Sequence, residues 1–161
     1  MRIRSICEAD MGQCLAIYNY YIENTCYTFE EALLEPEQFR GRVSRITRRF
    51  PYFVAVKDGQ VLGYAYLDAF HERSAYRYTA DLSIYVDRRC VQMGVGSVLL
   101  AEIERSAKEV GLKNIISVIA SCNEGSVRFH EKHGFRCMGE LENVGYKFHQ
   151  WLSVKYYQKG L

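Results

Sequence analysis

The chain has 161 residues, 48% of them hydrophobic, and this suits one compact domain over residues 1–161. Its formal net charge of +2 is too small to indicate a nucleic-acid surface. Residues 1–7 alternate charged and apolar side chains, unlike a signal peptide, and no later run is long enough to span a bilayer. We therefore expect a cytoplasmic domain with neither a nucleic-acid nor a membrane partner.

The first part of the chain predicts a strand followed by two helices. Asp10 precedes a run with helical hydrophobic spacing, residues 11–22, and its side chain is suited to cap that helix. Pro36 suits the first turn of a second helix, which runs toward Arg49 and is expected to carry a solvated basic face. A phosphate-binding role for this basic stretch is the less favoured alternative.

The rest of the chain alternates strands and helices. Two β-rich runs flank Asp58-Gly59, a dipeptide typical of tight hairpin turns, and Gly111 suits the end of a helix whose buried face contains Leu99, Ile103, Ala107 and Val110. The expected elements are a hairpin of residues 52–57 and 60–70, a strand over 78–86, a helix up to residue 111, a strand over 114–120, a helix over about 126–133, and one or two closing strands. This order predicts a layered α/β or α+β fold.

The six cysteines lie in scattered contexts without a zinc-like spacing, so we expect no metal site. They are Cys7, Cys14, Cys26, Cys90, Cys122 and Cys137. Buried free thiols are the favoured interpretation. A nucleophilic role for Cys122 is the alternative, but no paired His or Asn motif accompanies it.

Residues 85–97 hold the most informative segment, because two glycines, Gly94 and Gly96, stand between a predicted strand and a long helix. Glycine lets the backbone approach a ligand closely, and the free amides of a helix N-terminus suit a diphosphate. An ordinary tight turn is the alternative. The segment lacks the Lys and Ser or Thr of a Walker loop and the third glycine of a dinucleotide fingerprint. Coenzyme A (CoA) remains as the candidate ligand.

This segment, followed by a strand and then by residues 123–135, resembles the GCN5-related N-acetyltransferase (GNAT) superfamily, and most closely its phosphinothricin acetyltransferase group. Further matching segments cover nearly the whole chain: residues 20–25, Phe29, Arg73, residues 75–76, 79–81 and 83–86, and residues 145–151. The resemblance implies a mixed, mostly antiparallel central sheet with helices on both faces, and acetyl-CoA as cosubstrate.

The resemblance also implies how acetyl-CoA is bound. The backbone of Ile84, Tyr85 and Val86 would bind the pantetheine arm as an added strand, and Asn123 would orient the end of that arm. The diphosphate would be held by Gln92, Met93, Gly94, Val95, Gly96 and Ser97. The superfamily usually has Arg or Gln where this chain has Val91. One side-chain contact is therefore lost, although backbone amides make most contacts in such a loop.

Two residues are expected to move protons. In the resembled group a Glu lies on the central strand where this chain has Asp81, and this carboxylate, shorter by one methylene, is expected to act as a water-mediated base toward the amine. The alternative is that Asp81 merely ends a pleat or pairs with Arg77 or Arg73. His130 stands where the superfamily often has a tyrosine and the resembled group a histidine. It can act as an acid toward the departing thiolate or as a partner of the carboxylate.

The substrate implied by the resemblance is the primary amine of a small amino-acid analogue such as phosphinothricin, methionine sulfone or methionine sulfoximine. Residues in segments that line the amine pocket of that group are Tyr21, Phe29, Arg73, Tyr76 and Lys147. Arg73 or Lys147 can bind a carboxylate, phosphinate or sulfone oxygen. The resemblance implies a homodimer, and the aromatic closing strands, with Trp151, Tyr156 and Tyr157, fit either an interface or a core. Rival functions are acetylation of protein N-termini or other amines and non-catalytic CoA binding.

Overall fold

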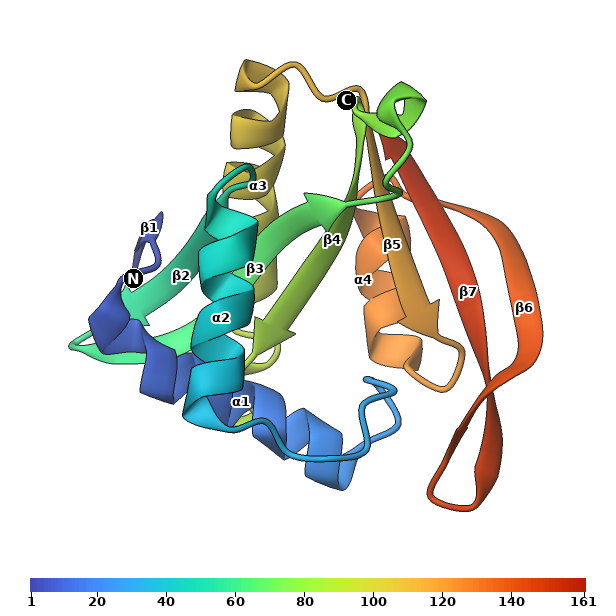
Figure 1. The fold of residues 1–161 in the computed structure, drawn as a ribbon, viewed down its shortest axis with the longest axis horizontal. Coiled ribbons are helices and arrows are strands. Elements are labelled where there is room, and N and C mark those ends of the chain that lie inside the picture. The colour runs from blue at the N-terminus through green and yellow to red at the C-terminus, as the bar shows by residue number, and fades with distance from the viewer.

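The computed structural model describes all residues from Met1 to Leu161 and contains one sheet of seven strands in the order β1-β2-β3-β4-β5-β7-β6 (Figure 1). The strands are β1 (Arg2–Ser5), β2 (Tyr52–Lys57), β3 (Gln60–Ala69), β4 (Thr79–Val86), β5 (Asn114–Ala120), β6 (Arg136–Lys147) and β7 (Gln150–Gly160). Only β4 and β5 pair in parallel, whereas every other neighbouring pair is antiparallel. The predicted mixed, mostly antiparallel sheet is confirmed.

Helices cover both faces of this sheet (Figure 1). On one face lie α1 (Met11–Asn24) and α2 (Pro36–Thr47), and on the other lie α3 (Val95–Glu109) and α4 (Glu124–Lys132). Each face has its own core: Phe39 of α2 is buried with Tyr64 of β3, and Leu99 of α3 is buried with Leu82 of β4. No helix is long and apolar enough to cross a membrane.

The neighbouring strands β4 and β5 separate after a short parallel contact. Their pairing covers only Thr79–Asp81 of β4 against Asn114–Ile116 of β5. Farther along, residues 82–86 remain paired with β3, and residues 117–120 remain paired with β7. The β4 edge that faces β5 is therefore left without a strand partner, and this separation opens the middle of the sheet.

The local turn and helix signals are confirmed. Asp58 and Gly59 have positive φ values of 51° and 78° in the turn between β2 and β3. Helix α2 begins at Pro36, and Gly111 follows α3 with φ of 84°.

Two expectations about side chains are wrong. The Asp10 side chain makes no capping bond to α1; its carboxylate instead accepts hydrogen bonds from the Arg4 guanidinium at 2.6 and 2.8 Å. Val110 lies beyond the end of α3 and is 62% exposed, because the helix stops one residue before it. The basic face of α2 is exposed to solvent, as expected, and its arginines also bind acidic side chains: Arg40 binds Glu8 and Glu37, Arg42 binds Glu30, and Arg45 binds Asp68.

Candidate active site

A cavity of about 720 Å³ lies where β4 and β5 separate, between α3 and α4. Its wall contains nearly all of the residues predicted to bind the cofactor: Ile84, Tyr85, Val86, Gln92, Gly94, Val95, Gly96, Ser97 and Asn123. Met93 is not part of the wall, and its side chain is 62% exposed to solvent. The structure thus brings together two segments, β4 and the glycine loop, with the turn that contains Asn123.

The N-terminus of α3 presents backbone amides to this cavity. Gly94 is its N-cap residue with φ of 80°, a left-handed conformation that favours glycine. A Cβ built on Gly94 would have no atom within 4 Å, so the space beside this backbone is open. A Cβ on Gly96 would come within 3.2 Å of the Phe129 ring. Glycine at this position therefore lets α3 pack closely against Phe129 of α4. The first-turn amides lack intrahelical partners, and the helix dipole adds positive character.

The free edge of β4 forms the adjoining wall. Its residues Ser83–Val86 line the cavity and have no β5 partner, so their outward backbone groups suit an extended amide chain such as pantetheine. Tyr21 reaches the same edge, because its hydroxyl donates a 2.6 Å hydrogen bond to the Val86 carbonyl. Burial raises the pKa of Tyr21 to about 12, so this phenol stays neutral. Tyr21 therefore lines the same cavity as the β4 edge.

The two ends of the Asn123 side-chain amide have different surroundings. Its Oδ1 accepts a hydrogen bond of 3.1 Å from the Ser126 amide and so caps α4. Its Nδ2 group makes no hydrogen bond within the chain, although Asn123 lines the cavity. The Nδ2 group of Asn123 is therefore free to donate to a molecule in the cavity.

His130 is buried on the α3/α4 face and has both ring nitrogens occupied. Nδ1 lies 2.8 Å from the Ser126 carbonyl, which can only accept, so Nδ1 bears the proton. Nε2 then accepts from the Ser117 hydroxyl at 2.9 Å. Burial lowers the pKa of His130, since it disfavours the imidazolium. The chain therefore holds a neutral His130 that has no hydrogen bond to Asp81.

Asp81 lies on the opposite face of the sheet. Side chains alternate along β4, and Leu82 faces α3 whereas Tyr85 packs with α1 and α2, so Asp81 points toward the α1/α2 face. Its Oδ1 atom is covered but has no hydrogen-bond partner. Burial, with a smaller contribution from Asp68, raises the pKa of Asp81 to about 7. Asp81 forms no ion pair with Arg73 or Arg77, which contradicts the pairing with these arginines considered as an alternative.

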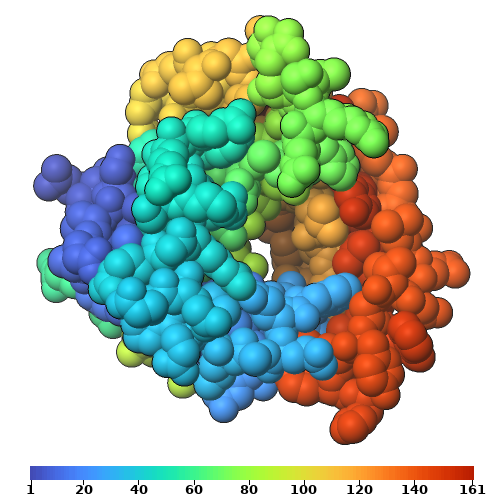
Figure 2. All heavy atoms as spheres, viewed as in Figure 1, coloured from blue at the N-terminus to red at the C-terminus, as the bar shows by residue number.

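The face of the molecule that contains α1 and α2 is hollowed at its centre (Figure 2). Around the hollow lie the segment after α1, the β3–β4 connection and the β6–β7 strands (Figure 2). Arg73 and Tyr76 belong to that connection, and both are exposed. Arg73 has no acidic partner in the structure, so its guanidinium is available for an anionic group.

Lys147 and Phe29 hold the segment after α1 against β6. Lys147 is 2% exposed and its Nζ donates a 2.9 Å hydrogen bond to the Thr28 carbonyl. Burial lowers the pKa of Lys147. The ring of Phe29 fills the space beside Gly145, where a Cβ would approach it to 2.3 Å. These contacts fasten the segment after α1 to β6.

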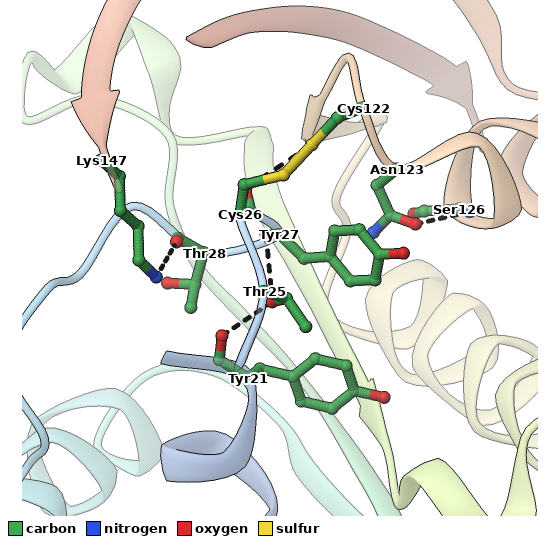
Figure 3. The surroundings of a disulfide bond; sticks show 9 residues. All are labelled: Tyr21, Thr25, Cys26, Tyr27, Thr28, Cys122, Asn123, Ser126 and Lys147. Atoms are coloured by element: carbon green, nitrogen blue, oxygen red, sulfur yellow. Dashed lines mark hydrogen bonds between the residues drawn. A yellow bond between two sulfur atoms is a disulfide. The ribbon is translucent and has the colours of Figure 1, made fainter. Parts of the chain in front are cut away.

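A disulfide joins Cys26 to Cys122, which corrects the expectation of free thiols at these positions (Figure 3). The two cysteines are 96 residues apart in the chain, so no spacing rule could pair them. Among the others only Cys14 is buried, whereas Cys7 and Cys137 are exposed and Cys90 is intermediate. Cys122 is therefore no free nucleophile here. The bond fastens the segment that contains Tyr27 to the turn that contains Asn123, and both of these residues line the cavity (Figure 3).

Replacing Cys26 with Ser is expected to lower the free energy of unfolding by about 2–4 kcal/mol under oxidising conditions, because the long loop is no longer closed in the unfolded chain. Denaturant titration of both proteins measures this difference. Cys137→Ser is the matched control, since Cys137 is exposed and free. An equal stability of Cys26→Ser and the unmodified protein, with and without reductant, would contradict a stabilising cross-link.

Several residues of the site escaped prediction. Ser117 and Ser126 fix the ring of His130, and Tyr27 and Phe129 line the cavity. Of these residues, Ser117 could have been found from the sequence, because it is a polar residue inside the apolar run of β5. Ser126 contacts His130 from one turn away on α4, whereas Tyr27 reaches the cavity from a distant part of the chain.

A sheet that splits between two parallel strands, beside an amide-lined helix N-terminus, defines a CoA-binding acyltransferase fold. The family model for an acetyltransferase (GNAT) domain matches residues 3–154. The chain belongs to the GNAT superfamily and is an N-acetyltransferase.

Known proteins similar to this chain agree with that assignment. A phosphinothricin N-acetyltransferase of Streptomyces viridochromogenes is 33% identical over 99% of this chain and 87% of the relative. A solved ribosomal-protein-alanine N-acetyltransferase of Brucella melitensis has a TM-score of 0.97 at 36% identity, with 100% of both chains covered. A phosphinothricin acetyltransferase of Sinorhizobium meliloti, solved in complex with acetyl-CoA, has a TM-score of 0.95 at 32% identity, covering 99% of this chain and 88% of that one.

Proposed function

We propose that this enzyme transfers acetyl directly from acetyl-CoA to the α-amine of a free amino-acid analogue of the phosphinothricin, methionine sulfone or methionine sulfoximine type. The observation that supports this most is the position of Asp81, a covered carboxylate on the hollowed face, beside the point where β4 and β5 separate. The similar phosphinothricin acetyltransferases support the substrate class. Arg73, which has no acidic partner, is the residue proposed to bind a carboxylate, phosphinate or sulfone oxygen of the substrate.

Acetyl-CoA would supply an acetyl group activated as a thioester. The α3 amides at Gly94–Ser97 would hold its diphosphate, the β4 edge its pantetheine arm, and Asn123 Nδ2 the end of that arm. Asp81, directly or through one water, would accept the proton that the substrate ammonium must lose. The neutral amine nitrogen then forms the new C–N bond while the C–S bond breaks, and the proton that the nitrogen loses on becoming an amide passes, directly or through water, to the departing CoA sulfur. No acyl-enzyme and no metal ion take part.

His130 is assigned a supporting task in this reaction. A neutral ring whose proton is on Nδ1, bonded to Ser126, has none on Nε2 to give to a thiolate. Its Nε2 instead orients the Ser117 hydroxyl at the cavity wall. We assign His130 and Ser117 to holding the shape of the cavity wall near the departing sulfur. Lys147, already bonded to Thr28, is assigned to holding the segment after α1 in place.

A thiol-release assay with acetyl-CoA tests the substrate class. Phosphinothricin, methionine sulfone and methionine sulfoximine should each give a kcat/KM at least about tenfold above that of methionine, because the added oxygens gain charge-assisted bonds. Peptides with N-terminal alanine are the comparison for the rival activity. Thiol release with these peptides alone would favour acetylation of protein N-termini. Binding of CoA without thiol release from any amine would favour a binding module.

We also propose that the enzyme is a homodimer formed through β6 and β7. Strand β6 is the outer strand of the sheet, and the hairpin exposes many apolar side chains: Met138, Leu141, Val144, Tyr146, Phe148 and Trp151. A long exposed edge with such side chains is typical of a surface that another chain covers. Tyr157 is 1% exposed and belongs to the core, contrary to an interface role. Light scattering that gave the mass of one chain at micromolar concentration would exclude this dimer.

The proposed location is the cytoplasm, without nucleic-acid or membrane partners. The arginines Arg40, Arg42 and Arg45 bind acidic side chains of the same chain, which leaves no basic stripe on α2 for phosphates. Disulfides of cytoplasmic proteins are mostly reversible, so the Cys26–Cys122 bond is expected to open under reducing conditions there. Fractionation that placed the protein outside the cytoplasm would contradict this location.

A further inference from the structure

Asp81 has a second carboxylate directly beside it. In the antiparallel ladder of β3 and β4, Asp68 is the residue opposite Asp81. Directly opposite residues point to the same face, with Cβ atoms about 4.5–5.5 Å apart. The two carboxyl groups therefore lie side by side on the hollowed face of the sheet, and two neighbouring half-buried carboxylates resist being ionised together.

Only one of the two carboxylates has a cationic partner. Arg45 of α2 donates hydrogen bonds of 3.0 and 2.7 Å to the two carboxylate oxygens of Asp68, and the Ala69 amide donates another of 2.8 Å. Burial works to raise the pKa of Asp68, but these bonds outweigh it and leave that pKa below its usual range. Asp68 is thus the ionised member of the pair. Its negative charge disfavours ionisation of the neighbouring Asp81 carboxyl group.

We propose that Asp68, fixed by Arg45, is a positioning residue that determines how strongly Asp81 holds its proton. The inference rests on the proposed function, in which Asp81 is the base. Asp68 makes Asp81 a better proton acceptor, and Arg45 limits that effect by neutralising part of the Asp68 charge. An ordinary aspartate, with a pKa near 3.9, would accept an ammonium proton poorly. The neighbouring Asp68 charge therefore makes Asp81 more basic than such an aspartate.

The charges around the pair are few. On β3 the charged group is Asp68, beside the phenol of Tyr66, whose pKa is raised by burial. Arg45 on α2 and Arg49, just beyond the end of α2, both lower the pKa of Asp68. On the other side β5 places the apolar Ile116 opposite Asp81. A cavity of about 350 Å³ beneath α2 is lined by both Asp68 and Arg45. Water there screens the interaction, so the expected effect on Asp81 is moderate.

The test compares the pH dependence of kcat/KM in two single variants. Asp68→Asn keeps the shape but removes the negative charge, so the acidic limb should move down by about 0.5–1 pH unit. Arg45→Gln removes the neutralising charge, so the same limb should move up by about 0.5 pH unit. Asp58→Asn is the matched control, because Asp58 lies in the exposed β2–β3 turn. Opposite shifts cannot arise from a general loss of structure.

A limb that stays in place in both variants, or moves in the same direction in both, would overturn the inference. If Asp68→Asn folds poorly, NMR titration of the Asp81 carboxyl carbon in Arg45→Gln and in the unmodified protein gives the same comparison without catalysis. An unchanged titration there would also overturn it. Failure of the proposed function has a different result: Asp81→Asn itself would retain full activity.

Discussion

Replacing Asp81 with Asn lowers kcat by about 100- to 1,000-fold, whereas the affinity for CoA changes by less than about twofold. Asparagine keeps the shape of the side chain on β4 but cannot accept the proton of the ammonium. Asp81 is on the α1/α2 face, away from the amides of the glycine loop, so cofactor binding does not depend on its charge. Steady-state kinetics and calorimetry measure the two quantities.

The pH dependence of kcat/KM tests the role of Asp81 in a second way. Since the pKa of Asp81 is raised to about 7, its carboxylate gains a proton as the pH falls through that value, and kcat/KM should fall with an inflection near pH 7. This inflection should be lost in Asp81→Asn, where only the titration of the substrate amine remains. Asp58→Asn again serves as the control. Turnover by Asp81→Asn equal to that of the unmodified enzyme would remove Asp81 from the mechanism.

Replacing Gly94 with Ala weakens the binding of CoA by about tenfold or more, equal to about 1.4 kcal/mol. The new methyl group would point into the open space beside the glycine loop, where the diphosphate is proposed to lie. The substitution also strains the backbone, because φ at Gly94 is 80°. Calorimetric titration with CoA measures the loss of affinity.

Gly111→Ala separates these two effects. Gly111 lies beyond the other end of α3, also has a left-handed φ, of 84°, and likewise has no atom within 4 Å of a built Cβ. Both variants should therefore lose about 1 kcal/mol of stability, but only Gly94→Ala should lose affinity. An equal affinity for CoA in the two variants would contradict a ligand at Gly94.

The sequence predicted the elements whose signals are local. The Asp58-Gly59 turn, the start of α2 at Pro36 and the end of α3 near Gly111 each depend on backbone preferences of one or two residues. These preferences act without help from distant parts of the chain, and a sequence displays them directly.

Features that depend on distant partners were missed or wrong. Aspartate is a suitable capping residue, but the carboxylate of Asp10 accepts hydrogen bonds from the Arg4 guanidinium instead. Cys26 and Cys122 meet only because the segment after α1 crosses to the end of β5. The opposed carboxylates of Asp68 and Asp81 depend on the register of β3 and β4. Tertiary contacts of this kind have no fixed spacing in the chain.

The candidate site divides in the same way. The glycine loop was visible as a motif, because helix N-termini and glycines bind phosphates by backbone groups. The protonation of His130 was not visible, because Ser117 on β5 and Ser126 on α4 determine it together. Lys147 has the charge expected of a substrate ligand, yet its ammonium group is bonded to the Thr28 carbonyl.

Hydrogen exchange of the backbone amides with and without CoA tests the central claim most directly. If the mouth of α3 and the free edge of β4 hold the cofactor, added CoA should slow exchange in peptides that contain Gly94–Ser97 and Ile84–Val86. Peptides from α2, on the other face of the sheet, should exchange at an unchanged rate. Unaltered exchange at both cofactor segments, at a CoA concentration that saturates the enzyme, would contradict this account.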